Sequence, residues 1–251
     1  MIVITGPGRS GTSFLAALYR ELGFDPGGRW ESNVRAGLEH RDVVALNLVV
    51  GRALGVSVDL RRGGGFLKGL GVLEHVSDGR VSPRFRDPFT AVVDALRYRR
   101  ATPDLMDWSA LERVARRYGE AMRNLAKDRS VVKDPRFCWT LGAWLAGDVP
   151  VEAVVLAIRP LEAMADSRVK AGMYSPRARD WARHNYCYGL GLLMTTATQY
   201  RLPLTTLRFP DFLEQPDKLY DMLPLPAPRT RPEFLDAFAA VFDPALVHDN
   251  R

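Results

Sequence analysis

A glycine-rich segment near the start of the chain has the residue types and spacing of a phosphate-binding loop. Residues 6–13 read Gly-Pro-Gly-Arg-Ser-Gly-Thr-Ser, which matches the pattern GxxxxGK[ST] except that Thr12 stands where the lysine belongs. Backbone N–H groups of such a loop, with the N-terminus of the following helix, can still hold an anion. The lysine normally reaches the β- and γ-phosphates, so its absence disfavours ATP-dependent phosphoryl transfer. The simplest alternative is a glycine turn that binds nothing.

A phosphate-binding loop needs a strand before it and a helix after it, and the sequence predicts both. Strands alternate with helices along the chain, which is typical of an α/β protein, here a single-domain P-loop nucleotide-binding fold with a central parallel β-sheet flanked by helices. The run at 151–158 is almost entirely apolar, so we assign it to the centre of the sheet. Strands are predicted at 2–5, 130–133, 151–158 and 204–207, and helices at 13–22, 37–54, 107–127, 137–145, 178–200, 212–223 and 234–241, with another helical stretch after 160.

Two helix starts carry capping signals. Ser109 followed by Glu112 predicts a capping box at the start of one helix. Asp134 and Pro135 are suited to the cap and to the first position of the next helix.

One region lacks a clear period. Residues 55–87 are rich in glycine and arginine and show neither helical nor strand periodicity. We therefore predict irregular structure near a site, and an acceptor-binding insertion around 55–107.

Composition and charge narrow the classes of function. The chain has 251 residues, of which 47% are hydrophobic, and this suits one domain with a buried core. Its 35 Lys and Arg against 29 Asp and Glu give a net charge of +6 that is spread along the sequence, which favours an anionic small molecule as ligand. A nucleic-acid binder is expected to show a basic stripe or a reading module, and the sequence has neither.

The cysteines, the histidines and the apolar runs bear on metals and compartment. Cys138 and Cys187 lack CxxC spacing, and the histidines lack metal-ligand spacing, so neither a disulfide framework nor a metal site is predicted. Residues 1–5 resemble a strand rather than a signal peptide, and no run approaches the roughly 18 apolar residues of a membrane span. The sequence thus predicts a soluble, cytoplasmic protein with no membrane span, and leaves the oligomeric state open.

The loop resembles that of the sulfotransferases that use 3′-phosphoadenosine-5′-phosphosulfate (PAPS). Their loop runs Pro-Lys-Ser-Gly-Thr-Thr, or Pro-Arg-Ser-Gly-Thr in bacterial branches, and residues 8–13 here read Gly-Arg-Ser-Gly-Thr-Ser. In place of the lysine that stabilises the bridging oxygen, arginine keeps the charge and adds a planar fork. The resemblance implies that the 5′-phosphosulfate is held by Arg9, Ser10, Gly11, Thr12 and Ser13.

A second signature of that family is an arginine that ends a buried strand and a serine eight residues later, which together bind the 3′-phosphate. Arg159 and Ser167 have this spacing. Arg159 would then lie at the carboxyl end of a strand, where ligands bind in open α/β sheets, and a charged donor beside a hydroxyl suits a phosphate. Taken alone, each residue could equally be an ordinary surface position.

The resemblance extends over most of the chain, from residue 2 to about 223. Three stretches, 37–47, 132–137 and 207–216, are similar to bacterial members of the family. The sequence departs from the eukaryotic cytosolic branch because no histidine follows Lys133 and no Arg-Lys-Gly loop occurs near the end.

The general base is predicted from the same resemblance. Related bacterial and carbohydrate-modifying branches place a glutamate after the first helix, so Glu39 is favoured, with the adjacent His40 as its rival and with neither as the third option. Neighbouring positions on a helix point about 100° apart, so at most one of the two should face the site. Lys133 could stabilise the sulfuryl oxygens or the leaving phosphate, or form a surface ion pair instead.

We therefore expect a bacterial PAPS-dependent sulfotransferase. It would move a sulfuryl group to a hydroxyl or amine of a small-molecule or carbohydrate acceptor and release 3′-phosphoadenosine-5′-phosphate (PAP), with no metal. One alternative is a P-loop small-molecule or nucleoside kinase, which would require Mg²⁺ and ATP. The other is a non-catalytic nucleotide-binding protein on the same fold.

Overall fold

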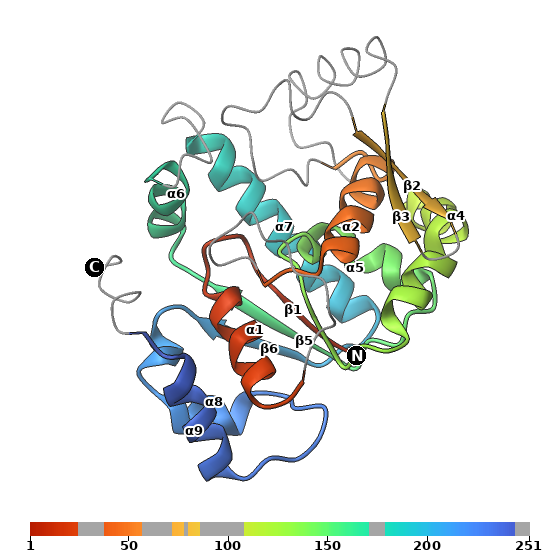
Figure 1. The fold of residues 1–251 in the computed structure, drawn as a ribbon. Helices are drawn as coiled ribbons and strands as arrows, with labels where there is room; N and C mark the ends of the chain where they lie inside the picture. Colours follow the sequence, from red (N-terminus) through yellow and green to blue (C-terminus); the bar gives the residue numbers. More distant parts are fainter. Residues whose placement is uncertain (25–37, 57–71, 78–79, 86–107, 171–178, 244–251) are drawn as a thin grey trace.

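The centre of the protein is a wholly parallel sheet. The computed structural model describes residues 1–24, 38–56, 72–77, 80–85, 108–170 and 179–243. Four of its strands pair in the order β4-β1-β5-β6 (Figure 1). They have the bounds Ile2–Thr5 (β1), Val131–Lys133 (β4), Ala153–Ile158 (β5) and Leu204–Arg208 (β6). The predicted α/β fold with a central parallel sheet is confirmed.

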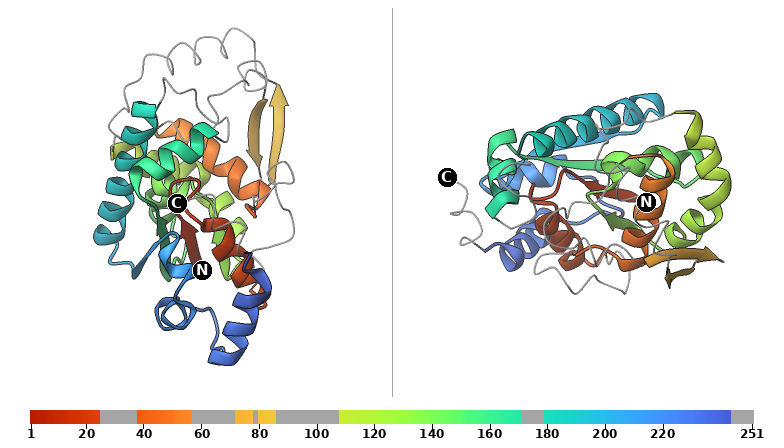
Figure 2. Two further views of the ribbon diagram at one scale, coloured as in Figure 1. Left: turned by 90° about the vertical axis from the view of Figure 1, so that its left-hand side faces the viewer. Right: turned by 90° about the horizontal axis from the view of Figure 1, so that it is seen from above.

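Helices cover both faces of this sheet, as the two further views show (Figure 2). One face packs on α1, α8, α9 and the 3-10 helix η2, and the other packs on α2, α4, α5 and α7. The helix α6 packs against α7. The bounds are Thr12–Glu21 (α1), Arg41–Ala53 (α2), Ser109–Ala126 (α4), Phe137–Ala146 (α5), Leu161–Lys170 (α6), Arg179–Gln199 (α7), Asp211–Leu213 (η2), Pro216–Met222 (α8) and Arg231–Val241 (α9).

Side chains of the strands alternate between the two faces. Val154 and Leu156 of β5 belong to the cluster under α2, α4, α5 and α7, whereas Ala153, Val155 and Ala157 belong to the cluster under α1 and α9. Because both faces are buried, both sets of positions must be apolar. This explains why the β5 sequence has no polar alternation.

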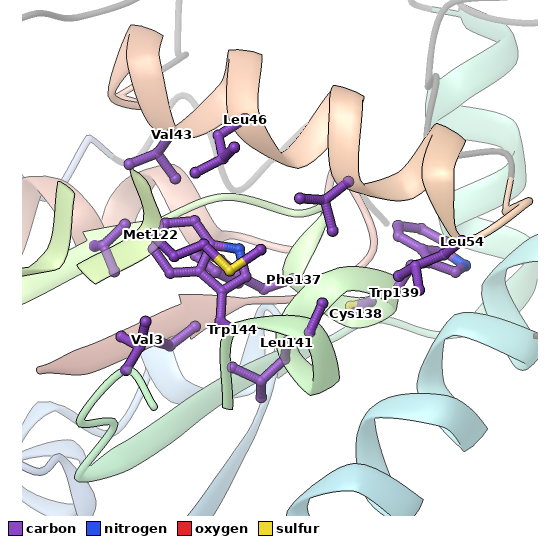
Figure 3. Close-up of a cluster of buried hydrophobic side chains, with 14 of the residues drawn as sticks. Val3, Val43, Leu46, Leu54, Met122, Phe137, Cys138, Trp139, Leu141 and Trp144 are labelled. Carbon is purple, nitrogen blue, oxygen red and sulfur yellow. The ribbon is translucent and has the colours of Figure 1, made fainter. Parts of the chain in front are cut away.

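The packing between α2 and α5 fixes the position of α2 over the sheet. Figure 3 shows Val43 and Leu46 of α2 directed toward Phe137 and Trp144 of α5. The rings of Phe137 and Trp144 meet edge to face, with centroids 5.2 Å apart, and both side chains are almost completely buried. Burying one such side chain stabilises the fold by roughly 1.5–3 kcal/mol. The position of the residues that directly precede α2 is therefore fixed by a helix that is well packed against α5.

The region predicted to be irregular contains a hairpin. Val72–Ser77 (β2) pairs antiparallel with Arg80–Phe85 (β3), in a register that runs from Val72 opposite Phe85 to Ser77 opposite Arg80. The prediction of irregular structure was wrong for these residues. The Asp-Gly dipeptide between the two strands is a strong hairpin signal, and it outweighs the lack of a strand period in the flanking residues. The rest of the predicted acceptor-binding insertion, 57–71 and 86–107, lies outside the described residues.

The capping box predicted for α4 is wrong. The N-cap position is Trp108 and receives no side-chain cap, while the hydroxyl of Ser109 accepts a hydrogen bond from Arg113 instead. A capping box occurs at α9, where the side chains of Thr230 and Glu233 each accept from the backbone N–H of the other. In the first case Ser109 is already the first residue of the helix, one position past the N-cap, so its hydroxyl cannot form a capping box.

Two other helix boundaries differ from the prediction. The helix predicted at 212–223 is divided, because Pro216 starts α8 after the short helix η2, and proline lacks the N–H that a continuous helix would need. Before α5, Asp134 and Pro135 occupy a turn, and the carboxylate of Asp134 accepts from the backbone N–H of Arg136. Asp134 therefore caps the turn rather than the helix.

Among the helices that the structure describes, none is long and apolar enough to cross a membrane.

Candidate functional site

The glycine-rich loop joins the carboxyl end of β1 to the N-terminus of α1, as its pattern predicted. Gly6 has φ +153°, and a Cβ there would lie 2.1 Å from the carbonyl oxygen of Ala157 in β5. Gly11 has φ +87°, and a Cβ there would lie 2.5 Å from Cδ2 of Phe209. Both contacts are closer than real Cβ atoms allow, so these two positions require glycine.

Arg9 adopts a conformation that side chains rarely take. Its φ is +77°, in the left-handed region, which is uncommon for residues other than glycine. Strain of this kind is of order 1–3 kcal/mol and tends to be kept where it serves a site. Here it directs an exposed arginine side chain across the loop toward α6.

Arg9, Arg159 and Ser167 meet at the edge of the loop. Nε of Arg9 donates to Oγ of Ser167 at 3.1 Å, and a terminal nitrogen of Arg159 donates to the backbone oxygen of Arg9 at 3.3 Å. Arg159 is only 7% exposed. Burial lowers the pKa of Arg159, and the positive charge of Arg9 lowers it further. Two like charges held this close are stabilised when an anion binds between them.

The hydroxyl of Ser10 is buried inside the loop. Ser10 is completely buried, and among the described residues no group forms a hydrogen bond with its Oγ. A buried polar group left unpaired costs roughly 1–3 kcal/mol. The first turn of α1 contains no acidic side chain, so its N–H groups and its dipole remain suited to an anion. An anion bound in the loop would satisfy the Ser10 hydroxyl as well.

Lys133 and Glu39 form a buried ion pair on the other side of the loop. Lys133 ends β4, its side chain is 2% exposed, and its Nζ donates both to Oε1 of Glu39 and, at 3.3 Å, to Oγ of Ser13. Burial lowers the pKa of Lys133, while the adjacent charge of Glu39 and, more weakly, that of Asp134 raise it. Lys133, at the end of the neighbouring strand β4, thus places beside Ser13 the ammonium group that the loop lacks at position 12.

His40 contacts different groups from those that Glu39 contacts. Its Nδ1 accepts from the backbone N–H of Asp42 at 3.3 Å, and its Nε2 lies 3.0 Å from the guanidinium of Arg129. Both Glu39 and His40 precede α2, which begins at Arg41, so the argument from helical spacing does not apply to them. The structure brings Glu39 into contact with Lys133, whereas the hydrogen bonds of His40 described here are with Asp42 and Arg129.

Apart from His40, the predicted site residues lie at the carboxyl edge of the sheet, most of them in two groups. We call Arg9, Ser10, Arg159 and Ser167 the arginine half, and Ser13, Glu39 and Lys133 the lysine half. Gly11 and Thr12 lie between them, at the N-cap and the first residue of α1. Within the described residues, no cluster of three His, Cys, Asp or Glu side chains could hold a metal ion.

Two residues that support Arg159 were not predicted. The ring of Phe209 lies under its guanidinium, 5.5 Å from centroid to Cζ, and the hydroxyl of Tyr186 donates to its backbone oxygen at 2.7 Å. Phe209 directly follows β6 within the stretch similar to bacterial sulfotransferases, which was a usable signal. Nothing in the local sequence singled out Tyr186, because it reaches Arg159 from α7.

A cavity of about 540 Å³ opens at the opposite, amino end of the strands. Its wall includes the chain's first residue, whose α-amino group already donates to the oxygen of Pro150 at 3.0 Å and pairs with Glu152 at 2.7 Å. The residues of the arginine and lysine halves do not line it. We therefore place the candidate site at the loop.

No protein-family model and no curated protein sequence matches the chain. Among solved structures it is similar to a sulfotransferase domain from the curacin biosynthetic pathway, with a TM-score of 0.46, 15% identity, and 99% of this chain and 89% of that chain covered. It is also similar to the sulfotransferase STF1 from Mycobacterium tuberculosis H37Rv, with a TM-score of 0.42, 18% identity, and coverage of 99% and 73%. The chain is similar as well to the sulfotransferase domain of the Synechococcus PCC 7002 olefin synthase, with a TM-score of 0.42, 16% identity, and 98% of this chain and 84% of that chain covered. At these identities and TM-scores the likenesses carry no argument about activity.

Proposed function

We propose that the protein is a sulfotransferase that moves a sulfuryl group from PAPS to a hydroxyl or amine of a small-molecule or carbohydrate acceptor and releases PAP. One observation carries the proposal. Arg9 and Arg159 converge with Ser167 at the loop, where the buried hydroxyl of Ser10 has no hydrogen-bond partner among the described residues, and the Lys133–Glu39 pair lies at the same loop beside Ser13.

The arginine half fits a nucleotide with phosphates at both ends of its ribose. The loop and the N-terminus of α1 would hold the 5′-phosphosulfate, with the Ser10 hydroxyl donating to it. Arg159 and Ser167 would hold the 3′-phosphate through a charge-assisted hydrogen bond and a hydroxyl. Because Arg9 contacts Ser167 directly, one arginine links the two phosphate positions.

The lysine half supplies the groups that the transfer needs. Glu39 accepts the proton of the acceptor hydroxyl or amine while the acceptor atom forms a bond to sulfur and the bond from sulfur to the 5′-phosphate oxygen breaks. The carboxylate of Glu39 has more lone pairs than Lys133 uses, so it can accept a second donor. Lys133 and Arg9 stabilise the negative charge that develops on the sulfuryl and phosphate oxygens.

A transfer assay with two labelled donors tests the proposal. The protein is incubated with PAPS labelled with ³⁵S, and separately with Mg-ATP labelled at the γ-phosphate, in the presence of 2-naphthol and of glucosamine as acceptor probes. We expect label to leave PAPS and PAP to accumulate without Mg²⁺. Transfer of label from ATP instead would favour the kinase. A protein that binds PAP but releases no ³⁵S label from PAPS would favour the non-catalytic alternative.

A further inference from the structure

A fully buried asparagine lies at the centre of a polar network behind the lysine half. Asn47 of α2 is 0% exposed. Its Nδ2 donates to Oδ2 of Asp134 at 2.9 Å, and its Oδ1 accepts from Thr140 and from the indole of Trp144, both at 2.8 Å. One amide therefore joins α2 to the turn after β4 and to α5.

Asp134, the partner of Asn47, is held just as completely. Its Oδ1 accepts from the backbone N–H of Arg136 at 2.9 Å and pairs with the side chain of Arg136 at 3.0 Å. Its backbone N–H donates to the oxygen of Ile4 at 3.2 Å, and its backbone oxygen accepts from the hydroxyl of Thr5 at 3.0 Å. The residue that follows Lys133 is thus fixed to the strand that leads into the loop.

The geometry points to Asn47 as a positioning residue, which sets the Lys133–Glu39 pair against Ser13 by locking α2 onto Asp134. Glu39 lies two residues before α2, and Lys133 directly precedes Asp134. The hydrogen bond between Asn47 and Asp134 therefore connects the two segments that carry the pair. Its meaning for catalysis rests on the proposed function, and Asn47 itself touches no reacting atom.

The composition of the network argues for this role over simple packing. A leucine of similar volume would leave the buried carboxylate of Asp134 and the donors of Thr140 and Trp144 without the amide that pairs with them. A buried amide is tolerated only when its partners are placed correctly, so it selects one orientation of α2. The carboxylate of Asp134 also places a second negative charge near Lys133, which favours the charged form of the lysine.

The test uses Asn47→Asp, which keeps the shape of the side chain and places two carboxylates face to face. The coupling between Glu39 and Lys133 is measured by a double-mutant cycle of Glu39→Gln and Lys133→Met, from urea unfolding at neutral pH, with Asn47 present and with Asn47→Asp. We expect the coupling to fall to less than half in the Asn47→Asp background. Thr140→Val removes one donor of the network at constant shape, and we expect a smaller loss there, which keeps the test available if Asn47→Asp does not fold.

Thr196→Val is the matched control. Thr196 is a buried residue of α7, 2% exposed, and takes no part in the network. An unchanged coupling in both network variants, or an equal loss in Thr196→Val, would overturn the inference. The cycle contains no nucleotide, so a wild-type protein that fails to bind PAP would count against the proposed function alone.

A kinetic readout separates positioning from general damage. In protein that turns over PAPS, Asn47→Asp should lower kcat at least tenfold while PAP affinity stays within threefold, because none of the hydrogen bonds described above joins the arginine half to the network. Equal losses of kcat and PAP affinity would overturn the positioning role.

Discussion

The two halves of the site handle charge in opposite ways. In the arginine half, the positive charge of Arg9 lies close enough to lower the pKa of Arg159, and within the part of the chain that the structure describes the buried Ser10 hydroxyl has no hydrogen-bond partner. In the lysine half, Lys133 is paired with Glu39. The first half is stabilised by an added anion, whereas the second is already neutral. This difference suits a highly charged donor on one side and an uncharged acceptor group on the other.

The largest expected effect comes from removing the base of the lysine half. Glu39→Gln should lower the rate of PAP release from PAPS by roughly 10²–10⁴-fold, the usual contribution of a general base. PAP affinity should change little, because in the proposed arrangement Glu39 acts on the acceptor and does not hold a phosphate. Initial rates and PAP titrations check this, with Glu152→Gln, at a carboxylate 70% exposed and far from the loop, as control. Unchanged turnover would remove Glu39 as the base.

The next largest effect should appear in the arginine half. Arg159→Ala should weaken PAP binding by roughly 10- to 100-fold, as expected for losing one charge-assisted hydrogen bond. The affinity for AMP, which lacks the 3′-phosphate, should fall much less. Arg208→Ala is the control, since Arg208 also ends a strand but is 62% exposed. Equal losses for PAP and AMP would show that Arg159 does not read the 3′-phosphate.

A glycine substitution tests how closely the two halves depend on the loop. Gly11→Ala would strain a φ of +87° and push a methyl group into Phe209, which lies under Arg159. We expect the free energy of unfolding to fall by roughly 1–3 kcal/mol, with a loss of PAP affinity. Gly191→Ala in α7 meets nothing within 4 Å, and it should be neutral or stabilising because alanine favours a helix. Similar stabilities for the two variants would contradict the loop geometry.

The smallest expected effect is the pH dependence that Lys133 adds to stability. Burial lowers its pKa from the ordinary 10.5, so between the lowered value and 10.5 the unfolded chain binds more protons than the folded one. Stability therefore rises with pH across this window, by at most about 1.4 kcal/mol per pH unit. Lys133→Met should lack this rise when urea midpoints are compared from neutral to alkaline pH. Parallel profiles for the two proteins would mean that the pKa of Lys133 is not lowered.

Features encoded by neighbouring residues could be predicted from the sequence. The strand β5 is one continuous apolar run. The loop lies between β1 and α1, and the Arg159–Ser167 pair lies between the end of β5 and α6, so residue spacing along the chain determines where these side chains lie. The contacts of this pair could not be predicted, because the hydrogen bond between Arg9 and Ser167 joins residues 158 positions apart.

Features that depend on distant partners could not be predicted. The hydrogen bonds of Asn47 reach residues 87 to 97 positions away. Asn47 ends the stretch 37–47 that is similar to bacterial sulfotransferases, but nothing in that stretch indicates its partners. The hairpin of β2 and β3 is a different case, since its Asp-Gly dipeptide is a local signal that predicts such a turn. The PAPS donor, the acceptor class and the roles of the site residues stay predictions.

The most direct test of the central claim is a calorimetric titration of the wild-type protein with PAP, ADP and ATP, each with and without Mg²⁺. The account predicts binding of PAP that is independent of Mg²⁺ and much tighter than that of ADP or ATP, because the proposed site holds the 5′- and 3′-phosphates at two separate positions. A preference for Mg-ATP over PAP would contradict the account and favour a kinase.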